Sequence, residues 1–236
     1  MSIYCIVLAL GIIAVTVFLV LRVKEGGIKA LLLKSAASVL FIASAISAFS
    51  ASGSNKLYFA GMIILSLVLG LLGDICLDLK WIYPDDNDVY TFAGFGSFGI
   101  AHIFIYAVLL IWFADISNIW SYLIPLIAST IIAVLVILLE KPMKLKYGKF
   151  KAISFFYVFI LMLWTFTAGS FALISDFNNT ALNLLTIGGL LFLISDLILS
   201  GTYFGEGKRR PVDIISNHSC YYLSQFVIAS SLLFIK

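Results

Sequence analysis

Eight stretches of about 20 apolar residues follow one another along this chain, and they constrain its fold more than any other feature. An α-helix of about 20 apolar residues spans the hydrocarbon core of a bilayer, which is about 30 Å thick. Charged or turn-forming residues bound each stretch, and the linkers between stretches are short. The stretches cover residues 2–21, 30–49, 57–79, 89–114, 119–139, 152–175, 181–204 and 214–235.

Composition agrees with a membrane protein. Of the 236 residues, 62% are hydrophobic and only 11% are charged, whereas a soluble domain carries about 25% charged residues. We therefore expect an all-α polytopic membrane bundle of eight transmembrane helices, with residues 1–236 forming a single transmembrane domain. The first stretch has no basic residue before it and no small-residue cleavage site after it, which favours a retained helix over a signal peptide.

The basic residues predict how the bundle is oriented. Twelve of the 15 lysines and arginines lie in the linkers after the first, third, fifth and seventh stretches. They are Arg22, Lys24, Lys29, Lys80, Lys141, Lys144, Lys146, Lys149, Lys151, Lys208, Arg209 and Arg210. Because basic linkers stay in the cytosol, we expect both termini on the extracytoplasmic side. On this interpretation the basic residues set the orientation of the helices in the membrane and need bind no ligand. The net charge of +3 is too small to predict a nucleic-acid partner.

Three cysteines, Cys5, Cys76 and Cys220, lie far apart within apolar stretches. An odd number of cysteines without a Cys-x-x-Cys pair encodes neither a disulfide framework nor a zinc site. We therefore expect the cysteines to be buried packing residues, and we expect no metal.

A few ionisable side chains interrupt the apolar stretches. They are Lys34, Asp74, Asp78, His102, Asp196 and His218. Each costs about 2.5 to 3.5 kcal/mol at the centre of a bilayer, so each should face a partner or a water-filled cavity. With the predicted orientation, Asp74 and Asp196 both fall in the cytosolic halves of their helices. We expect these two carboxylates to meet in one cavity that opens to the cytosol.

Each of these residues also has a purely structural interpretation. Lys34 could extend to the cytosolic headgroups, and Asp78 could be solvated at the membrane interface. A single histidine in a membrane helix can hydrogen-bond a neighbouring helix. Asp74 and Asp196 could be tied to Lys34, to a tyrosine or to the backbone.

Helical spacing groups further side chains with the ionisable residues, because residues three, four and seven apart share one face of a helix. One such group is His218, Tyr221, Tyr222 and Gln225, and another is Gly94, Phe98, His102 and Tyr106. Small residues next to the two aspartates permit close helix packing; they are Gly70, Gly73, Gly188, Gly189 and Ser195.

Two carboxylates in one partly dry cavity can act as an acid beside a base, as they do in glycosidases. The chain contains no Gly-x-Ser-x-Gly elbow, His-Glu-x-x-His zinc motif or phosphate-binding loop, which argues against a serine hydrolase, a metalloprotease or a nucleotide enzyme.

Four local motifs resemble the YhhN-like family of membrane proteins, which includes lysoplasmalogenases. The segments that carry the resemblance are Gly73-Asp74 with Leu77, Gly94-x3-Phe98-x3-His102, the run GGLLFLISDL over 188–197, and Tyr221-Tyr222-x-x-Gln225. Lys34 also stands where the family tends to have a lysine. The family usually has Pro, Tyr and Asn at the positions that Ser35, Ile105 and Thr202 occupy here.

The resemblance implies hydrolysis of the vinyl-ether bond of lysoplasmalogens in a cell membrane, bacterial by expectation, without a cofactor. Asp74 and Asp196 would be catalytic, one as the acid and one as the base. The residues that would bind or orient the substrate are Lys34, His102, Tyr106, His218, Tyr221, Tyr222 and Gln225. The partners would be the lysophospholipid substrate and membrane lipids.

Two other functions stay open. Gly73-Asp74 followed by His102 and Tyr106 is echoed by Ser195-Asp196 followed by His218 and Tyr222, a pattern that an internal duplication would produce. Such duplications and buried proton-binding residues are typical of transporters, although no stretch has a central proline. A lipid-binding membrane protein without catalytic activity is the third possibility.

Overall fold

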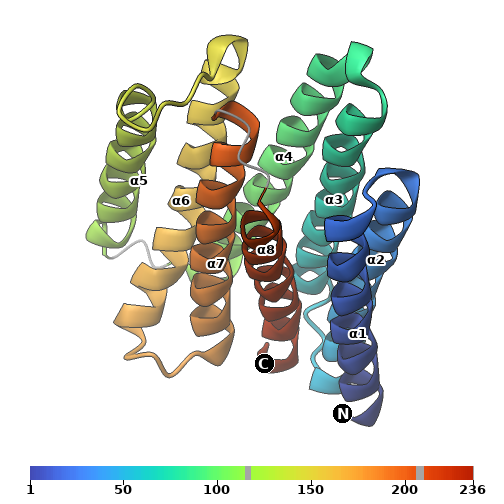
Figure 1. Cartoon of the computed structure of the whole chain (residues 1–236). Helices are drawn as coiled ribbons and strands as arrows, with labels where there is room; N and C mark the ends of the chain where they lie inside the picture. The colour runs from blue at the N-terminus through green and yellow to red at the C-terminus, as the bar shows by residue number, and fades with distance from the viewer. Residues whose placement is uncertain (115–117, 206–209, 236) are drawn as a thin grey trace.

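A computed structural model describes residues 1–114, 118–205 and 210–235. Lys208, Arg209 and Lys236, which enter the charge count above, lie outside these residues. The described residues form eight α-helices and three short 3₁₀ helices (Figure 1). The α-helices are α1 (Ser2–Lys24), α2 (Gly27–Ser52), α3 (Leu57–Ile82), α4 (Asn87–Phe113), α5 (Trp120–Leu138), α6 (Lys151–Ile174), α7 (Thr180–Phe204) and α8 (Pro211–Ser231), and the 3₁₀ helices are η1 (Pro84–Asp86), η2 (Gly148–Phe150) and η3 (Leu232–Phe234). The all-helical prediction is confirmed. The expectation of three buried cysteines is wrong, because Cys5 is exposed and Cys76 and Cys220 are half-buried.

Seven of the described helices, all except α8, are long and apolar enough to cross a membrane. The exception has a physical cause, because α8 lies inside the bundle and packs against α1, α2, α3 and α7. Its polar residues Asn217, Ser224 and Gln225 are buried among these neighbours instead of facing lipid. The prediction of eight similar apolar spans is therefore confirmed for seven helices, whereas α8 is a more polar central helix.

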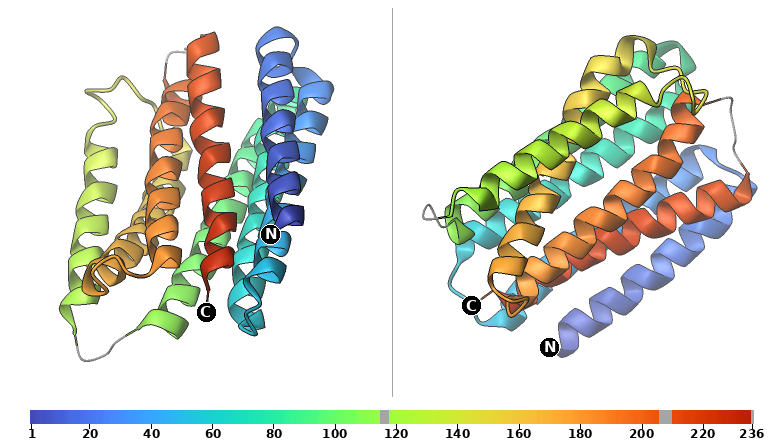
Figure 2. Two further views of the ribbon diagram at one scale, coloured as in Figure 1. Left: turned by 90° about the horizontal axis from the view of Figure 1, so that it is seen from below. Right: turned by 90° about the vertical axis from the view of Figure 1, so that its left-hand side faces the viewer.

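Consecutive helices run in alternating directions, and both termini lie at the lower end of the molecule in Figure 1. The linkers that follow α1, α3 and α5 are at the upper end, and the cavity described below is at the same end. Figure 2 shows α8 between α7 and α1. This alternation brings the upper halves of α2, α3, α7 and α8 together, although they are far apart in the sequence.

Two glycines allow the helices that carry Asp74 and Asp196 to approach their neighbours. A Cβ atom on Gly73 of α3 would lie 2.5 Å from the ring of Phe98 on α4. A Cβ atom on Gly189 of α7 would lie 2.2 Å from the Thr165 hydroxyl oxygen on α6. Close approach of this kind is how helices gain van der Waals contact within a membrane.

Candidate functional site

A cavity of about 560 Å³ lies at the upper end of the bundle. Lys24 at the end of α1 and Glu25 of the linker that follows line its rim. Asp74 and Asp196 both line this cavity, as the sequence analysis expected. The cavity therefore brings together two acids that are 122 positions apart in the chain.

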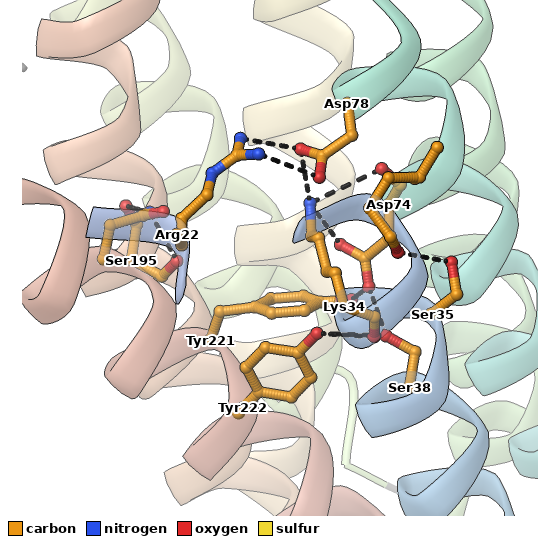
Figure 3. Close-up of polar contacts among 11 residues, drawn as sticks. Arg22, Lys34, Ser35, Ser38, Asp74, Asp78, Ser195, Tyr221 and Tyr222 are labelled. Atoms are coloured by element: carbon orange, nitrogen blue, oxygen red, sulfur yellow. Dashed lines mark hydrogen bonds and ion pairs between the residues drawn. The ribbon is translucent and has the colours of Figure 1, made fainter. Parts of the chain in front are cut away.

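Asp74 is buried and bound on both carboxylate oxygens. Its Oδ1 lies 3.2 Å from the Lys34 ammonium nitrogen of α2. Its Oδ2 accepts hydrogen bonds from the Tyr221 hydroxyl at 2.7 Å and from the Ser38 hydroxyl at 2.8 Å (Figure 3). One cation and two hydroxyl donors thus converge on this carboxylate from α2 and α8.

One helical turn further along α3, Asp78 is also buried and joins two cations. The Arg22 guanidinium of α1 donates to both of its carboxylate oxygens, at 2.9 Å and 3.2 Å (Figure 3). Lys34 donates to Asp78 Oδ1 at 3.3 Å. Arg22, Asp78, Lys34 and Asp74 therefore form a chain of alternating charge, which we call the charge ladder. Its two cations balance its two carboxylates, which offsets the cost of placing them in an apolar bundle.

Asp196 has different surroundings. The Tyr157 hydroxyl of α6 donates to Asp196 Oδ2 at 2.7 Å. Within the described parts of the chain, no lysine or arginine lies within 4.0 Å of its carboxylate. The preceding residue, Ser195, accepts hydrogen bonds from the Asn217 amide of α8 on its carbonyl oxygen at 2.8 Å and its hydroxyl oxygen at 3.0 Å. These bonds fix the register of α7 against α8 next to Asp196.

Apolar side chains form much of the wall of the cavity that holds the two acids. They are Leu77, Phe95, Phe98, Val158, Leu161, Phe192 and Leu193. A wall of this kind suits a hydrocarbon chain, while the polar groups at fixed points can bind or act on a functional group. The arrangement therefore fits an amphiphilic ligand.

The structure separates the remaining expected site residues into two groups. His218 and Tyr221 of α8 line the cavity with Lys34. The His218 ring also packs edge-on against Phe18 of α1, with ring centres 5.0 Å apart. Tyr222 lies behind the cavity wall and donates to the Lys34 carbonyl oxygen at 2.9 Å. It therefore positions α8 against α2, the helix that carries Lys34.

Like Tyr222, three further expected site residues, His102, Tyr106 and Gln225, do not line this cavity. His102 is buried, and its Nδ1 accepts the Trp164 indole N–H at 3.1 Å. The centre of its ring lies 5.4 Å from that of Tyr157, the tyrosine that binds Asp196. Gln225 is buried against a separate small void, and Tyr106 packs against the hydrophobic core.

Several basic and acidic residues differ from their sequence interpretation. Lys34 does not extend to the headgroups, because it is 4% exposed and paired with two carboxylates. Asp78 is not solvated at an interface but is 2% exposed. Arg22, counted above as a linker charge, lies within α1 and binds Asp78. Lys80, also counted as a linker charge, is buried in α3 over the ring of Tyr203.

The linker between α5 and α6 closes one side of the cavity. Leu145 and Tyr147 line the cavity and pack against Phe204 at the end of α7. Glu140 holds the linker by accepting the Tyr147 backbone N–H at 2.9 Å and by pairing with Lys151. These two contacts, with Lys151 the stronger, lower the pKa of the Glu140 carboxyl below its ordinary value. The linker is therefore anchored at neutral pH, when Glu140 is ionised.

The family model of the YhhN family matches residues 29–232. The chain belongs to the YhhN family. No curated protein and no solved structure matches the chain. This YhhN protein is therefore a helical membrane protein of a family that is associated with hydrolase activity. The match begins after Arg22, so it leaves out α1 and the outer end of the charge ladder.

The motif residues of this YhhN protein lie around one end of the bundle. Asp74, Asp196 and Tyr221 reach the cavity, whereas His102 and Gln225 lie in the layer below it. The described residues contain no group of three or more His, Cys, Asp or Glu side chains that could hold a metal ion. The polar groups that the cavity offers are carboxylates, hydroxyls, the His218 imidazole, the Asn217 amide and the cations that balance the carboxylates.

Proposed function

We propose that this protein is a lysoplasmalogenase, which hydrolyses the vinyl-ether bond of lysoplasmalogens to a fatty aldehyde and a glycerophosphoethanolamine or glycerophosphocholine. The observation that carries the proposal is that two carboxylates with unlike partners line one cavity with an apolar wall. Membership of a family that is associated with hydrolase activity also supports it. The apolar wall would hold the alkenyl chain, and the headgroup would face the end with the basic linkers.

The proposed chemistry is acid-base catalysis. A protonated aspartic acid delivers its proton to the vinyl carbon that is not bonded to oxygen, which leaves an oxocarbenium ion at the neighbouring carbon and the ether oxygen. The other aspartate, ionised, stabilises this cation and accepts a proton from the attacking water. The resulting hemiacetal then breaks down to the aldehyde and the glycerol hydroxyl. Acid-base groups of this kind contribute about 10²- to 10⁴-fold to rate.

The test is aldehyde release by the purified protein in detergent. Asp74→Asn and Asp196→Asn should each lower turnover by about two orders of magnitude or more, because each removes one of the two proton-transfer groups. Asp176→Asn is the matched control, since Asp176 is exposed beyond the far end of α6 and should leave turnover unchanged. Near-normal turnover in either cavity variant would disprove the two-carboxylate mechanism.

The substrate class is tested separately. Lysolipids with vinyl-ether, alkyl-ether and ester linkages should be incubated with the protein and the products analysed by mass spectrometry. Only the vinyl-ether lipid should yield aldehyde. Movement of intact solute across reconstituted vesicles, without aldehyde in detergent, would indicate a transporter instead, and binding without turnover would indicate a lipid-binding protein.

A further inference from the structure

The surroundings of the two acids differ in a way that gives them separate roles. We infer that the charge ladder keeps Asp74 ionised as the base, that Asp196 is the proton donor, and that Arg22 and Asp78 are positioning residues that make this division possible. The inference deepens the proposed function, because it assigns the acid and the base within the same site. It also adds two residues that no motif identifies.

The contacts of Asp74 favour its negative charge. A cation within 4 Å and hydrogen bonds to a carboxylate both stabilise the ionised form. Asp74 has both, from Lys34 at 3.2 Å and from the Tyr221 and Ser38 hydroxyls at 2.7 and 2.8 Å. All of these donors lose part of their interaction if Asp74 gains a proton, so protonation is opposed from two neighbouring helices.

Asp196 receives much less support for a negative charge. Its partner is the Tyr157 hydroxyl, which donates to Oδ2 and leaves Oδ1 as the oxygen that can carry a proton. Within the described residues no lysine or arginine pairs with it. A carboxyl group at an apolar wall without a cation stays protonated more readily than one that is ion-paired.

Arg22 and Asp78 determine how strongly the Lys34 ammonium group stabilises the Asp74 carboxylate. Lys34 lies 3.2 Å from Asp74 and 3.3 Å from Asp78, so the two carboxylates compete for it. The guanidinium of Arg22 binds Asp78 through both carboxylate oxygens and neutralises it. Without Arg22, one ammonium group would face two carboxylates, and one of them would take up a proton. Arg22 therefore acts on Asp74 through two intervening residues.

Other titratable groups around the two acids do not alter this assignment. Those that share the cavity or contact its wall are Arg22 and Lys24 of α1, Glu25 of the linker after α1, Lys34 of α2, Asp78 of α3, Tyr147 of the linker before α6, Tyr157 of α6, Tyr203 of α7, and Asp213, His218, Tyr221 and Tyr222 of α8. From α4, Phe98 faces the cavity and His102 lies below it, bound to Trp164. Three of these groups are lysines or arginines: Lys24 is exposed at the rim, whereas Arg22 and Lys34 pair with carboxylates, and both do so on the Asp74 side of the cavity.

The proton balance of the reaction follows from the assignment. Asp196 gives its proton to the vinyl carbon, and Asp74 accepts a proton from the water that forms the new C–O bond of the hemiacetal. When the hemiacetal breaks down, its hydroxyl proton returns to Asp196 and the proton on Asp74 passes to the leaving glycerol oxygen. Both acids then regain their starting states, so the cycle consumes one water and no other reagent.

The first test measures kcat/KM for aldehyde release against pH. Arg22→Gln should move the acidic limb of the profile to higher pH by about one unit or more, because Asp74 then holds a proton at higher pH. Asp78→Asn should leave the limb in place or move it to lower pH, and the double variant should return it close to wild type. Lys29→Gln is the matched control, since it removes one exposed cation at the same end of the bundle and should not move the limb. Arg22→Lys, which keeps the charge, should also leave it close to wild type.

A uniform loss of activity in Arg22→Gln without movement of the limb would show that Arg22 is merely structural and would overturn its assignment. The same conclusion follows if Asp78→Asn fails to offset Arg22→Gln. Chromatography and circular dichroism identify variants that do not fold. If Arg22→Gln is one of them, the pH of the acidic limb in Asp78→Asn and in Arg22→Lys still tests the charge ladder.

The second test needs no turnover. At neutral pH, the infrared carbonyl band of a protonated carboxyl group should be present in the wild type and in Asp74→Asn and absent in Asp196→Asn. The reverse pattern would overturn the assignment of acid and base. If the wild type shows this pattern but releases no aldehyde from any lysolipid, the proposed function fails while the assignment of charge stands.

Discussion

At the scale of single residues, the hydroxyl of Tyr157 is the contact that holds the proposed proton donor. Tyr157→Phe removes a hydrogen bond of 2.7 Å to Asp196 without changing the ring that packs against Phe95. One such bond corresponds to about a tenfold change in rate, so aldehyde release should fall by about that factor. Tyr106→Phe is the matched control, because Tyr106 does not line the cavity. Equal losses in the two variants would show that Tyr157 has no special role.

The residues that the sequence could predict are those whose presence in a membrane is costly. Asp74 and Asp196 stood out for that reason, and both line the cavity. Tyr157 could not be found in this way, because a tyrosine among apolar residues is common in a membrane helix. Arg22 was missed for a different reason, since an arginine at the end of a span is typical of the positive-inside pattern. Only the three-dimensional structure reveals that Arg22 of α1 binds Asp78 of α3.

At the scale of helices, the length of apolar runs predicted the spans well. For example, the run 57–79 corresponds to α3 over Leu57–Ile82, and 181–204 corresponds to α7 over Thr180–Phe204. Hydropathy predicted α8 less well because it measures suitability for lipid, and α8 is surrounded by other helices. Sequence periodicity indicated that Tyr221 and Gln225 share a face, but it could not show that only Tyr221 reaches the cavity.

The contact between α6 and α7 gives a prediction at this scale. Gly189→Ala would place a Cβ 2.2 Å from the Thr165 hydroxyl oxygen and 2.8 Å from the Trp164 ring. Forcing these helices apart should lower the free energy of unfolding by about 1–3 kcal/mol. It should also lower turnover, since Tyr157 on α6 and Asp196 on α7 must stay in contact. Thermal unfolding in detergent measures the first effect, and aldehyde release measures the second.

Gly99→Ala is the control for this prediction. Gly99 is in the interior of α4, and a Cβ there meets no atom within 4 Å. Alanine favours a helix over glycine by about 0.5–1 kcal/mol, so this variant should be as stable as the wild type or slightly more stable. If both variants unfold at the same temperature, the close contact between α6 and α7 does not limit stability.

At the scale of the whole molecule, the alternating helices separate the chain into two unlike ends. The end that bears the cavity also bears the linker between α5 and α6, which holds Lys141, Lys144, Lys146 and Lys149. The other end has only Lys56 among the lysines and arginines of the described residues. Basic linkers remain in the cytosol during insertion, so this asymmetry predicts that the cavity opens to the cytosol.

Labelling of single cysteines tests this orientation. In a background without Cys5, Cys76 and Cys220, Asn55→Cys reports on the linker after α2, and Lys141→Cys reports on the linker after α5; both positions are exposed. A membrane-impermeant maleimide should label Asn55→Cys in intact cells, and Lys141→Cys only after the cells are broken. The opposite pattern would place the cavity outside the cell. The proposed enzyme would then take lysolipid from the outer leaflet, and the basic linkers would lie outside the cell, contrary to the positive-inside rule.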